Sequence, residues 1–348
     1  MAAPIRVLVV DDSGVMRRAI TRRIESDSRF RVIDTASDGR EGVQKAMQLR
    51  PDVVTLDVEM PVMNGIQALR ALVSQTKIPV VMLSSVTKAG ADITMEALSL
   101  GAVDFIAKSV DGGEMIHEKL LAAARAKPQQ PGTPALLRER RLPPPPAKPA
   151  VAVSNAQRLR SAPPKLCLIG SSTGGPQVLH QVLGQLPEML RAPVVIAQHM
   201  PAQFTSALAK RLDQICRPRI VEAKNGDPLV AGTVYIAPGG MQTRVADNHI
   251  KVSPDRGESL YKPSVDVLGS SVLESYGGRV LGVMLTGMGS DGTAAFVKLH
   301  QAGAFNIAQT EDTCAVYGMP RSVVEADAAD EQLPPVQIGT RIANLLQA

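Results

Sequence analysis

The 348-residue chain contains no tryptophan, and aromatic residues make up only 3% of it. Its cores must therefore be built from aliphatic side chains and methionine, and the hydrophobic content of 45% is ample for that purpose. Scarce aromatics also argue against nucleic-acid binding, because such surfaces commonly interleave Lys and Arg with rings that stack on bases. The net charge of +5 comes from scattered Lys and Arg, so we expect no nucleic-acid partner.

Cysteine and long apolar runs are also scarce. The three cysteines, Cys167, Cys216 and Cys314, lie far apart without metal-ligand spacing, which is typical of small core residues in a reducing compartment. No apolar run approaches the roughly 18 residues of a membrane-spanning helix. The N-terminus also lacks the charged-then-apolar layout of a secretion signal. The sequence therefore predicts a cytoplasmic protein without a membrane span.

Proline is concentrated in one segment. Residues 127–164 hold ten of the 26 prolines, including the run from Pro143 to Pro146, and few apolar residues lie among them. Such a segment cannot form a core and is typical of a semi-rigid, exposed spacer. We therefore predict two domains, at residues 1–126 and 165–348, joined by a linker over residues 127–164.

The N-terminal domain is predicted to be a doubly wound α/β unit, because apolar runs of strand length alternate with segments of helical periodicity. Five alternating pairs imply a parallel sheet covered on both faces, with the carboxyl ends of the strands at one edge. The expected strands cover residues 5–10, 30–35, 52–56, 79–83 and 103–106, and the expected helices cover 13–26, 39–49, 65–74, 89–100 and 113–126.

Polar side chains gather at those strand ends. Asp11 and Asp12 follow the first strand, Asp57 the third, Ser84 the fourth and Lys108 the fifth. Three converging carboxylates repel one another unless a cation joins them, and oxygen ligands alone favour Mg²⁺. Asp57 is then a candidate nucleophile that forms an aspartyl-phosphate while the metal neutralises charge. Taken singly, each residue also has a structural interpretation, as a helix cap or a surface lysine.

These segments closely resemble the receiver domains of two-component response regulators over about residues 4–126. The resemblance implies a flavodoxin-like (βα)5 fold and transfer of phosphate from a chemotaxis-type histidine kinase to Asp57. The matching motifs are Val-Leu-Val-Val-Asp-Asp at 7–12, Leu-Asp-Val-Glu-Met-Pro at 56–61 with Asn64-Gly65, Val-Met-Leu-Ser-Ser at 81–85 and Asp-Phe-Ile-Ala-Lys at 104–108.

The resemblance also implies roles for the residues around the phosphorylation site. It implies that Mg²⁺ is held by Asp11, Asp12, Asp57 and the main-chain carbonyl of Glu59. It places the switch residues at Ser84, which would contact the phosphoryl oxygens, at Phe105 and at Lys108. Ser109 departs from the family pattern, since many receivers have proline there, so the cis peptide common at that place is not implied.

The C-terminal domain begins with an apolar strand at 165–169 that leads into the glycine-rich turn Gly170-Ser171-Ser172-Thr173-Gly174-Gly175. Pro176 suits the first turn of a helix predicted over about 176–186. The turn fits the Gly-x-Ser-x-Gly form of a nucleophile elbow, with Ser172 as the exposed hydroxyl. It equally fits a loop that binds an anion at a helix N-terminus, so the turn alone leaves both interpretations open.

Strands and helices alternate again after this turn, which predicts a largely parallel sheet with an antiparallel portion from the short middle strands. An apolar strand that starts near Ala192 ends at His199. The other expected strands cover 219–222, 233–237, 243–246, 249–252, 279–285 and 304–308, and the expected helices cover 203–215, 264–276 and 293–301.

Three polar side chains, Ser172, His199 and Asp291, follow core strands of this domain, where ligands of open α/β sheets bind. A serine nucleophile needs a neighbouring base, and that base needs a carboxylate to orient it. His199 alone among the five histidines ends a predicted buried strand. Asp266 and Asp312 compete with Asp291 for the carboxylate, and Asp291 could also cap the helix that follows it.

Residues 165–345 closely resemble the methylesterase domain of the chemotaxis response regulators called protein-glutamate methylesterases (CheB-type). The order Ser, His, Asp differs from the Ser, Asp, His order of α/β-hydrolases, so the elbow-like turn is interpreted as convergent. The matching motifs are Ile-Gly-Ser-Ser-Thr-Gly-Gly at 169–175, Gln-His-Met-Pro at 198–201, Tyr-Ile-Ala-Pro-Gly-Gly at 235–240, Pro-Ser-Val-Asp-Val-Leu at 263–268, Leu-Thr-Gly-Met-Gly-Ser-Asp-Gly at 285–292 and Tyr-Gly-Met-Pro at 317–320.

This resemblance implies that Ser172 attacks the γ-methyl ester of a methylated glutamate on the cytoplasmic domain of a chemoreceptor and releases methanol. His199 would act as general base and then as general acid, while Asp291 orients it. The main-chain N–H near Met288 would stabilise the oxyanion, and Thr173 would support the loop. Family members often also deamidate receptor glutamines, and no cofactor is implied for ester hydrolysis.

Ser171 is alanine or another small residue in relatives, so Ser172 is the expected nucleophile.

Two rival functions remain open at this point. A response regulator whose second domain only binds DNA or a receptor would need no such triad, and the chain lacks a helix-turn-helix pattern after the linker. An esterase or amidase acting on a small metabolite would use the same triad, and only a test with methylated receptor separates it from the expected enzyme.

Overall fold

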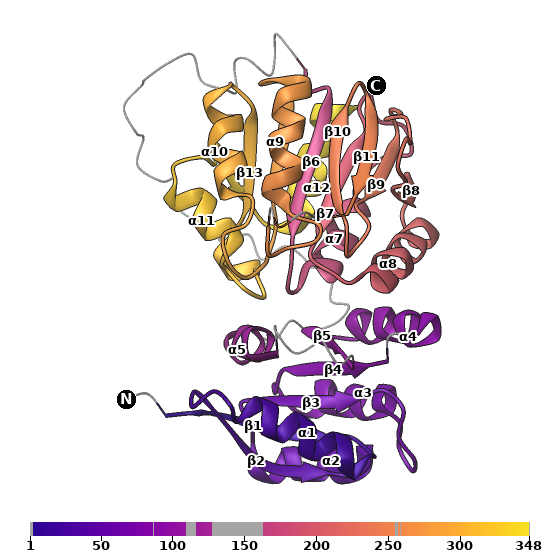
Figure 1. The fold of residues 1–348 in the computed structure, drawn as a ribbon, viewed down its shortest axis with the longest axis vertical. Helices are drawn as coiled ribbons and strands as arrows, with labels where there is room; N and C mark the ends of the chain where they lie inside the picture. The colour runs from indigo at the N-terminus through magenta and orange to yellow at the C-terminus, as the bar shows by residue number, and fades with distance from the viewer. Residues whose placement is uncertain are drawn as a thin grey trace.

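The computed structural model of the protein describes residues 3–85, 87–108, 116–126, 163–254, 257 and 259–347. Two α/β units lie one above the other, with the N-terminal unit at the bottom in Figure 1. Ser109, the start of the predicted helix 113–126 and nearly all of the predicted linker lie outside the described residues. Among the described residues, no helix is long and apolar enough to cross a membrane.

The N-terminal unit is a parallel sheet with the strand order β2-β1-β3-β4-β5. All its predicted strands and helices are confirmed, with ends that shift by a few residues. The strands are β1 (Ile5–Val10), β2 (Phe30–Ala36), β3 (Val53–Asp57), β4 (Val80–Ser84) and β5 (Asp104–Ala107), and the helices are α1 (Gly14–Ile24), α2 (Gly39–Leu49), α3 (Gly65–Gln75), α4 (Lys88–Ser99) and α5 (Ile116–Arg125).

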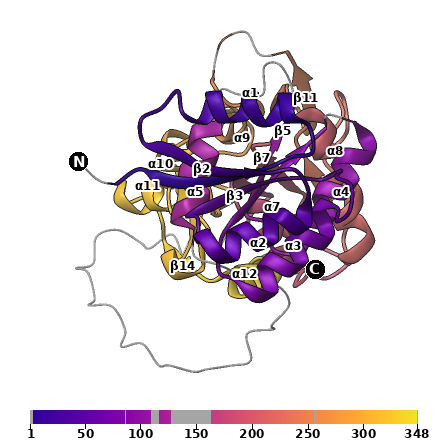
Figure 2. The ribbon, with the colours of Figure 1, turned by 90° about the horizontal axis from the view of Figure 1, so that it is seen from below.

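Helices cover both faces of this sheet, which is why its strands are apolar almost throughout. Ile20 and Ile24 of α1 pack with Leu120 of α5 against one face. Leu69 of α3 and Met95 of α4 belong to the cluster on the other face. Figure 2 shows α1 on one side of the strands and α2 and α3 on the opposite side. The polar strand ends are therefore left at one edge of the sheet.

The C-terminal unit is built on a seven-stranded parallel sheet with the order β14-β13-β12-β6-β7-β9-β8. Its strands are β6 (Leu166–Ser171), β7 (Val194–Gln198), β8 (Arg219–Glu222), β9 (Thr233–Ile236), β12 (Val280–Met284), β13 (Phe305–Gln309) and β14 (Glu331–Leu333). Its helices are α7 (Gly175–Leu183), α8 (Ala202–Ile215), α9 (Val265–Tyr276), α10 (Thr293–Gln301), α11 (Met319–Glu325) and α12 (Pro335–Leu346).

The short middle strands differ in part from the predicted arrangement. Among the middle strands that the structure describes, only β10 (Gln242–Ala246) and β11 (His249–Ser253) are antiparallel, and they form a separate two-stranded sheet. The residues between them, Asp247 and Asn248, both have positive φ, which suits a tight hairpin turn. Strands β8 and β9 instead pair in parallel and extend the main sheet. The prediction that all the middle strands supply an antiparallel portion is therefore wrong for β8 and β9.

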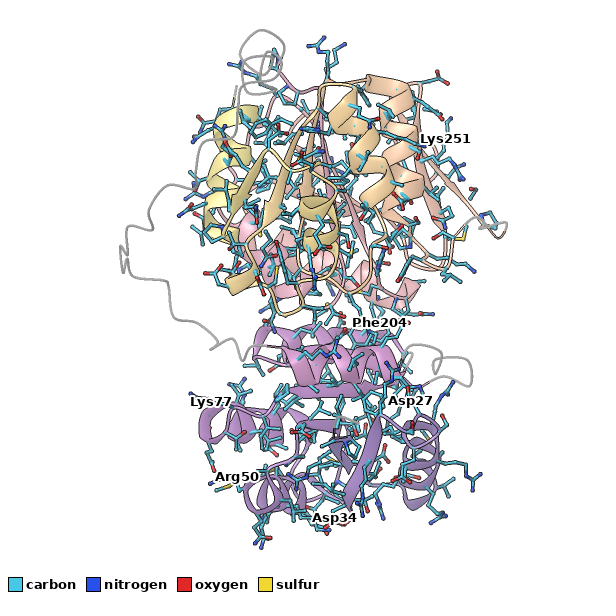
Figure 3. All side chains as sticks on the ribbon, turned by 90° about the vertical axis from the view of Figure 1, so that its left-hand side faces the viewer. Asp27, Asp34, Arg50, Lys77, Phe204 and Lys251 are labelled. Carbon is cyan, nitrogen blue, oxygen red and sulfur yellow. The ribbon has the colours of Figure 1, made fainter. Side chains whose placement is uncertain are left out.

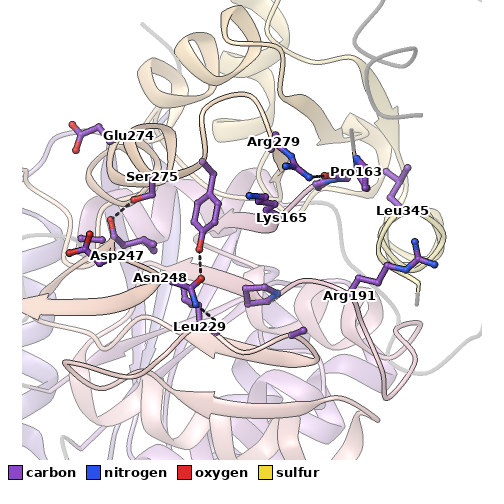
Figure 4. A pocket seen from close by; sticks show the side chains of 16 residues that line it. Pro163, Lys165, Arg191, Leu229, Asp247, Asn248, Glu274, Ser275, Arg279 and Leu345 are labelled. Carbon is purple, nitrogen blue, oxygen red and sulfur yellow. Dashed lines mark hydrogen bonds between the residues drawn. The ribbon is translucent and has the colours of Figure 1, made fainter. Parts of the chain in front are cut away.

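A cavity of about 880 Å³ lies at the edge of this sheet where strands begin. Lys165, Pro193 and Arg279 line it and directly precede β6, β7 and β12, respectively. Figure 4 shows Lys165 and Arg279 in this lining. The predicted catalytic side chains follow the opposite, carboxyl ends of these strands. The cavity is therefore remote from the candidate site, despite its size.

Candidate active site

Ser172 occupies the turn between β6 and α7. Its N–H donates to Thr286 O at 3.0 Å, and its carbonyl accepts from Gly175 N at 2.8 Å and from Gln198 Nε2 at 2.9 Å. Three hydrogen bonds thus fix the main chain of Ser172. Its hydroxyl makes no hydrogen bond within the described part of the chain. A fixed serine with an unengaged hydroxyl suits the role of a nucleophile.

The structure separates the two adjacent serines. Ser171 is fully buried, and its hydroxyl donates to Gln198 Oε1 at 2.6 Å. Gln198 ends β7, and its amide also donates to the carbonyls of Ser172 and His199. The Ser171 hydroxyl therefore links the ends of β6 and β7, while the Ser172 hydroxyl remains free to act as a nucleophile.

His199 follows β7, and its side chain is only 5% exposed. Its Nε2 lies 2.7 Å from Asp291 Oδ2. Its Nδ1 is buried and has no hydrogen-bond partner among the described residues. One ring nitrogen is thus bound to a carboxylate, and the other is left free, which is the state of a histidine poised to accept a proton.

Asp291 lies in the loop between β12 and α10, and its carboxylate contacts the N-terminus of α9. Its carboxylate accepts hydrogen bonds from Val265 N at 2.6 Å, from the Ser264 hydroxyl at 2.7 Å and from Asp266 N at 3.2 Å. Burial alone would raise the pKa of Asp291, but the contacts with His199, Val265 and Ser264 outweigh burial and lower that pKa below its ordinary value. Asp291 is therefore a charged partner for His199 at neutral pH.

The competing carboxylates have other contacts. Asp266 accepts from Ala295 N at 2.8 Å, in the first turn of α10, and Asp312 lies in the short 3₁₀ turn Glu311–Thr313. The alternative role of Asp291 as cap of the following helix is wrong, because the cap position of α10 is Gly292 and the carboxylate of Asp291 contacts α9 instead.

Thr173 follows Ser172 in the same turn, and Met288 lies in the glycine-rich loop after β12. Gly287, beside Met288, has no side chain, and a Cβ atom there would come within 2.8 Å of Ser172 Cβ. The Met288 N–H donates to no protein acceptor within the described ranges. The Thr173 hydroxyl donates to Asp104 Oδ2 of the N-terminal unit at 2.7 Å. Met288 thus directly follows a glycine that packs on Ser172, and Thr173 contacts the other unit.

Two residues of the site were missed by sequence reasoning. The ring of Tyr261 stacks on the His199 imidazole, with centroids 4.2 Å apart and planes 9° apart. Gln198 links both serines to His199, as described above. A polar residue at the end of an otherwise apolar strand was a signal for Gln198. Nothing in the sequence indicates the contact of Tyr261, because it depends on the path of the loop before α9.

The acidic cluster of the N-terminal unit forms as predicted from the strand ends. Carboxylate oxygens of Asp11, Asp12 and Asp57 lie within 4.8 Å of one another. Lys108 Nζ lies 2.7 Å from Asp11 Oδ2 and 2.6 Å from Asp57 Oδ2. Burial raises the pKa of Asp57 above its ordinary value, although Lys108 opposes that shift. These oxygens match the donor chemistry that Mg²⁺ prefers, and a bound cation would relieve their repulsion.

The other predicted receiver residues lie around this cluster. The buried Ser84 hydroxyl donates to Gly90 O at 3.2 Å and accepts from Thr94 Oγ1 at 2.7 Å. Its predicted contact with a phosphoryl group would therefore require these bonds to rearrange. The Glu59 side chain is exposed after β3, and the metal-binding role of its carbonyl stays a prediction.

The two units meet beside Ser172, across β5 and α4 of the N-terminal unit. The ring of Phe105 packs against that of Phe204 of α8, with centroids 4.1 Å apart and planes tilted by 32° (Figure 3 labels Phe204 at this boundary). Gln177 Nε2 of α7 donates to the carbonyls of Leu98 and Ala102, both at 2.7 Å. The predicted switch aromatic, Phe105, is thus buried against the unit that carries the candidate triad.

Comparison with known proteins places both units in known families. A family model described as CheB methylesterase matches residues 167–342, and one described as response regulator receiver domain matches residues 7–119. The chain is 44% identical to a protein-glutamate methylesterase/protein-glutamine glutaminase of Symbiobacterium thermophilum, over 97% of this chain and 96% of that protein. The chain belongs to the CheB methylesterase family.

Other members of the CheB family agree with this assignment. A protein-glutamate methylesterase/protein-glutamine glutaminase 1 of Vibrio cholerae is 40% identical, over 97% of this chain and 98% of that protein. The crystal structure of the Thermotoga maritima CheB methylesterase catalytic domain is similar to 53% of this chain and 99% of its own, with 37% identity and a TM-score of 0.50. The CheB fold predicted for the C-terminal domain is therefore confirmed.

Proposed function

We propose that this enzyme is a phosphorylation-activated protein-glutamate methylesterase that uses Ser172, His199 and Asp291 as a catalytic triad. The observation that carries the proposal is the 2.7 Å contact of His199 Nε2 with Asp291, which leaves His199 Nδ1 free at the strand ends that also hold Ser172. The enzyme would act in the cytoplasm, on the cytoplasmic domain of a chemoreceptor. We place its receiver at residues 1–126, its linker at 127–164 and its methylesterase domain at 165–348.

The two ring nitrogens of His199 have different roles in the proposed reaction. Nδ1 takes the proton of Ser172 Oγ as that oxygen attacks the carbonyl carbon of the glutamate γ-methyl ester. The same proton then goes to the leaving methoxide, so methanol departs and an acyl-enzyme remains. Water activated by Nδ1 hydrolyses the acyl-enzyme to glutamate. Asp291, held charged by its own hydrogen bonds, stabilises the imidazolium in both steps.

The N–H of Met288 is the proposed oxyanion donor, since Met288 directly follows Gly287, which packs on Ser172, and this N–H has no protein acceptor among the described residues. Loss of one such donor commonly costs about 10²–10³ in rate. Thr173 supports the loop, with its carbonyl accepting from Thr286 Oγ1 at 3.1 Å. Deamidation of a receptor glutamine would be the same acyl transfer with ammonia as the leaving group.

The test of this function is methanol release from methylated chemoreceptor in membranes, compared with release from small methyl esters. We expect the full chain, supplied with Mg²⁺ and a phosphodonor, to demethylate the receptor far faster than the small esters. Equal rates on both would favour an esterase of small metabolites. Receptor binding without methanol release would favour a binding domain.

Asp57 is the proposed phosphorylation site, with a chemotaxis-type histidine kinase as donor. Asp11, Asp12 and Asp57, with the Glu59 carbonyl, would hold Mg²⁺, which shields the negative charges that approach each other during phosphoryl transfer. Lys108, ion-paired to Asp57, would stay near the phosphorylated side chain.

Removal of Mg²⁺ is expected to abolish stimulation by a phosphodonor and leave the basal esterase rate unchanged, because the proposed triad needs no metal. The measurement is methanol release with and without a small phosphodonor, before and after chelation. Asp57→Asn is the matched control, since it should lose stimulation even with Mg²⁺ present. A fall in the basal rate on chelation would show that the esterase itself needs the ion.

The receiver is proposed to inhibit the esterase through the contacts beside Ser172. Asp104 accepts from Thr173, the residue after the nucleophile, and Phe105 packs on Phe204. Phosphorylation of Asp57 would change the environment of Ser84 and of the neighbouring strand β5, and so weaken this docking. Inhibition thus depends on bonds that can be removed without touching the triad.

Gln177→Ala is expected to raise the basal rate of the unphosphorylated chain. It removes two hydrogen bonds across the domain boundary, worth about 1–3 kcal/mol together, and so favours the open arrangement by roughly 5- to 150-fold. Methanol release without phosphodonor measures the effect. Gln181→Ala, on the exposed side of the same helix, should change nothing. An unchanged or lower rate for Gln177→Ala would contradict inhibition by docking.

A further inference from the structure

The plane of the His199 imidazole is not fixed by its hydrogen bonds alone. Its ring makes one hydrogen bond, from Nε2 to Asp291, and Nδ1 has no partner among the described residues. A single bond along the ring edge leaves the imidazole free to rock about that bond. A base must point at the proton it takes, so some other contact has to hold the plane of the ring.

Tyr261 supplies such a contact. Its ring lies parallel to the imidazole, with planes 9° apart and centroids 4.2 Å apart. Gly289 leaves room for the phenol, because a Cβ at that residue would come within 2.9 Å of Tyr261 Oη. The stacked ring thus lies between the base and the glycine-rich turn that carries Asp291.

The tyrosine itself is held by the same framework as Asp291. Its carbonyl accepts from Gln242 Nε2 at 2.8 Å, and its N–H donates to Ser259 Oγ at 3.1 Å. The buried Gln242 also accepts from Ser264 N at 3.0 Å, and the Ser264 hydroxyl donates to Asp291 Oδ1. One glutamine therefore sets the positions of both groups that contact His199.

We propose that Tyr261 is a positioning residue of the methylesterase: its ring fixes the plane of the His199 imidazole so that Nδ1 is directed for proton transfer. This inference rests on the proposed function, in which His199 is the base. The role belongs to the aromatic ring and needs no proton from the phenol. Phenylalanine should therefore replace tyrosine, and aliphatic side chains should not.

The test compares Tyr261→Phe, Tyr261→Leu and Tyr261→Ala in the full chain, with Asp57 phosphorylated so that docking of the receiver does not limit the rates. Methanol release from methylated receptor gives kcat and KM. We expect Tyr261→Phe to keep the wild-type kcat, and Tyr261→Leu and Tyr261→Ala to lower kcat about 10- to 100-fold with KM unchanged. Thermal unfolding checks that each variant folds, and Tyr261→Leu keeps more of the side-chain volume than Tyr261→Ala if the alanine variant does not fold.

Three outcomes would overturn the inference. Tyr261→Phe as slow as Tyr261→Ala would assign the role to the hydroxyl. A raised KM with unchanged kcat would make Tyr261 a substrate contact. Wild-type kcat in a folded Tyr261→Leu would remove any role in positioning. Ser172→Ala, assayed alongside, separates these results from failure of the proposed function, since its activity would refute the triad whatever Tyr261 does.

Discussion

Ser172→Ala is expected to lower kcat for methanol release by about 10⁴- to 10⁶-fold, since loss of the nucleophile leaves only binding and oxyanion stabilisation. The Ser172 side chain makes no hydrogen bond within the described residues, so its removal should cost little stability. The fold should therefore survive while turnover is lost. The measurement is steady-state methanol release from methylated receptor by the phosphorylated chain.

Ser171→Ala is the matched control, because it removes the same atom one residue earlier. That hydroxyl donates to Gln198 Oε1 inside the protein, and its loss leaves a buried acceptor unpaired at a cost of about 1–3 kcal/mol in stability. We expect a lower melting temperature and substantial remaining activity. An inactive Ser171→Ala beside an active Ser172→Ala would reverse the assignment of the nucleophile.

Asp291→Asn is expected to lower kcat by about 10⁴-fold. Asp291 accepts from His199 Nε2 and from donors at the start of α9, so an asparagine NH₂ would face a donor in at least one direction. The favoured rearrangement turns the amide so that His199 Nε2 becomes the acceptor. That change puts the proton on Nδ1 and blocks the base.

Asp266→Asn provides the comparison for this variant. Asp266 lies at the same end of α9, but its carboxylate accepts from Ala295 N, a bond that the asparagine oxygen can keep. Its kcat should stay close to that of the unchanged chain. If both variants lost activity equally, the loss would reflect disruption of the α9 terminus and not the orientation of His199.

Much of the fold follows from short-range patterns in the sequence. Parallel strands buried on both faces, such as β3 and β6, are continuous apolar runs, and the glycines and polar residues after them mark their ends. The C-terminal elements α11, β14 and α12 were not predicted. β14 has only three residues and no fully buried position, whereas the buried residues of α12, including Ile338 and Ile342, recur at helical spacing and were a usable signal.

The candidate site was predictable only in part. The strand ends brought Ser172, His199 and Asp291 to one edge, but the choice of Ser172 over Ser171 came from the family resemblance. The buried bond of Ser171 to Gln198 now gives a physical reason for that choice. The stacking of Tyr261 depends on tertiary structure that no local pattern encodes.

The contact between the two units was likewise beyond prediction from sequence. A proline-rich spacer indicates that two domains are joined but not how they pack. The bond from Thr173 to Asp104 and the packing of Phe105 against Phe204 join residues far apart in the chain. Because Thr173 is the neighbour of Ser172, its bond to Asp104 would connect phosphorylation of the receiver with hydrolysis in the proposed regulation.

The most direct test of that chemistry is to locate the acyl group during turnover. The phosphorylated chain would be mixed rapidly with methylated receptor, quenched in acid and digested, and the peptide that carries Ser171 and Ser172 examined by mass spectrometry. We expect a receptor glutamyl ester on Ser172, absent from Ser172→Ala and present in Ser171→Ala. An acyl group on any other residue, or methanol release by Ser172→Ala at the rate of the unchanged chain, would contradict this expectation.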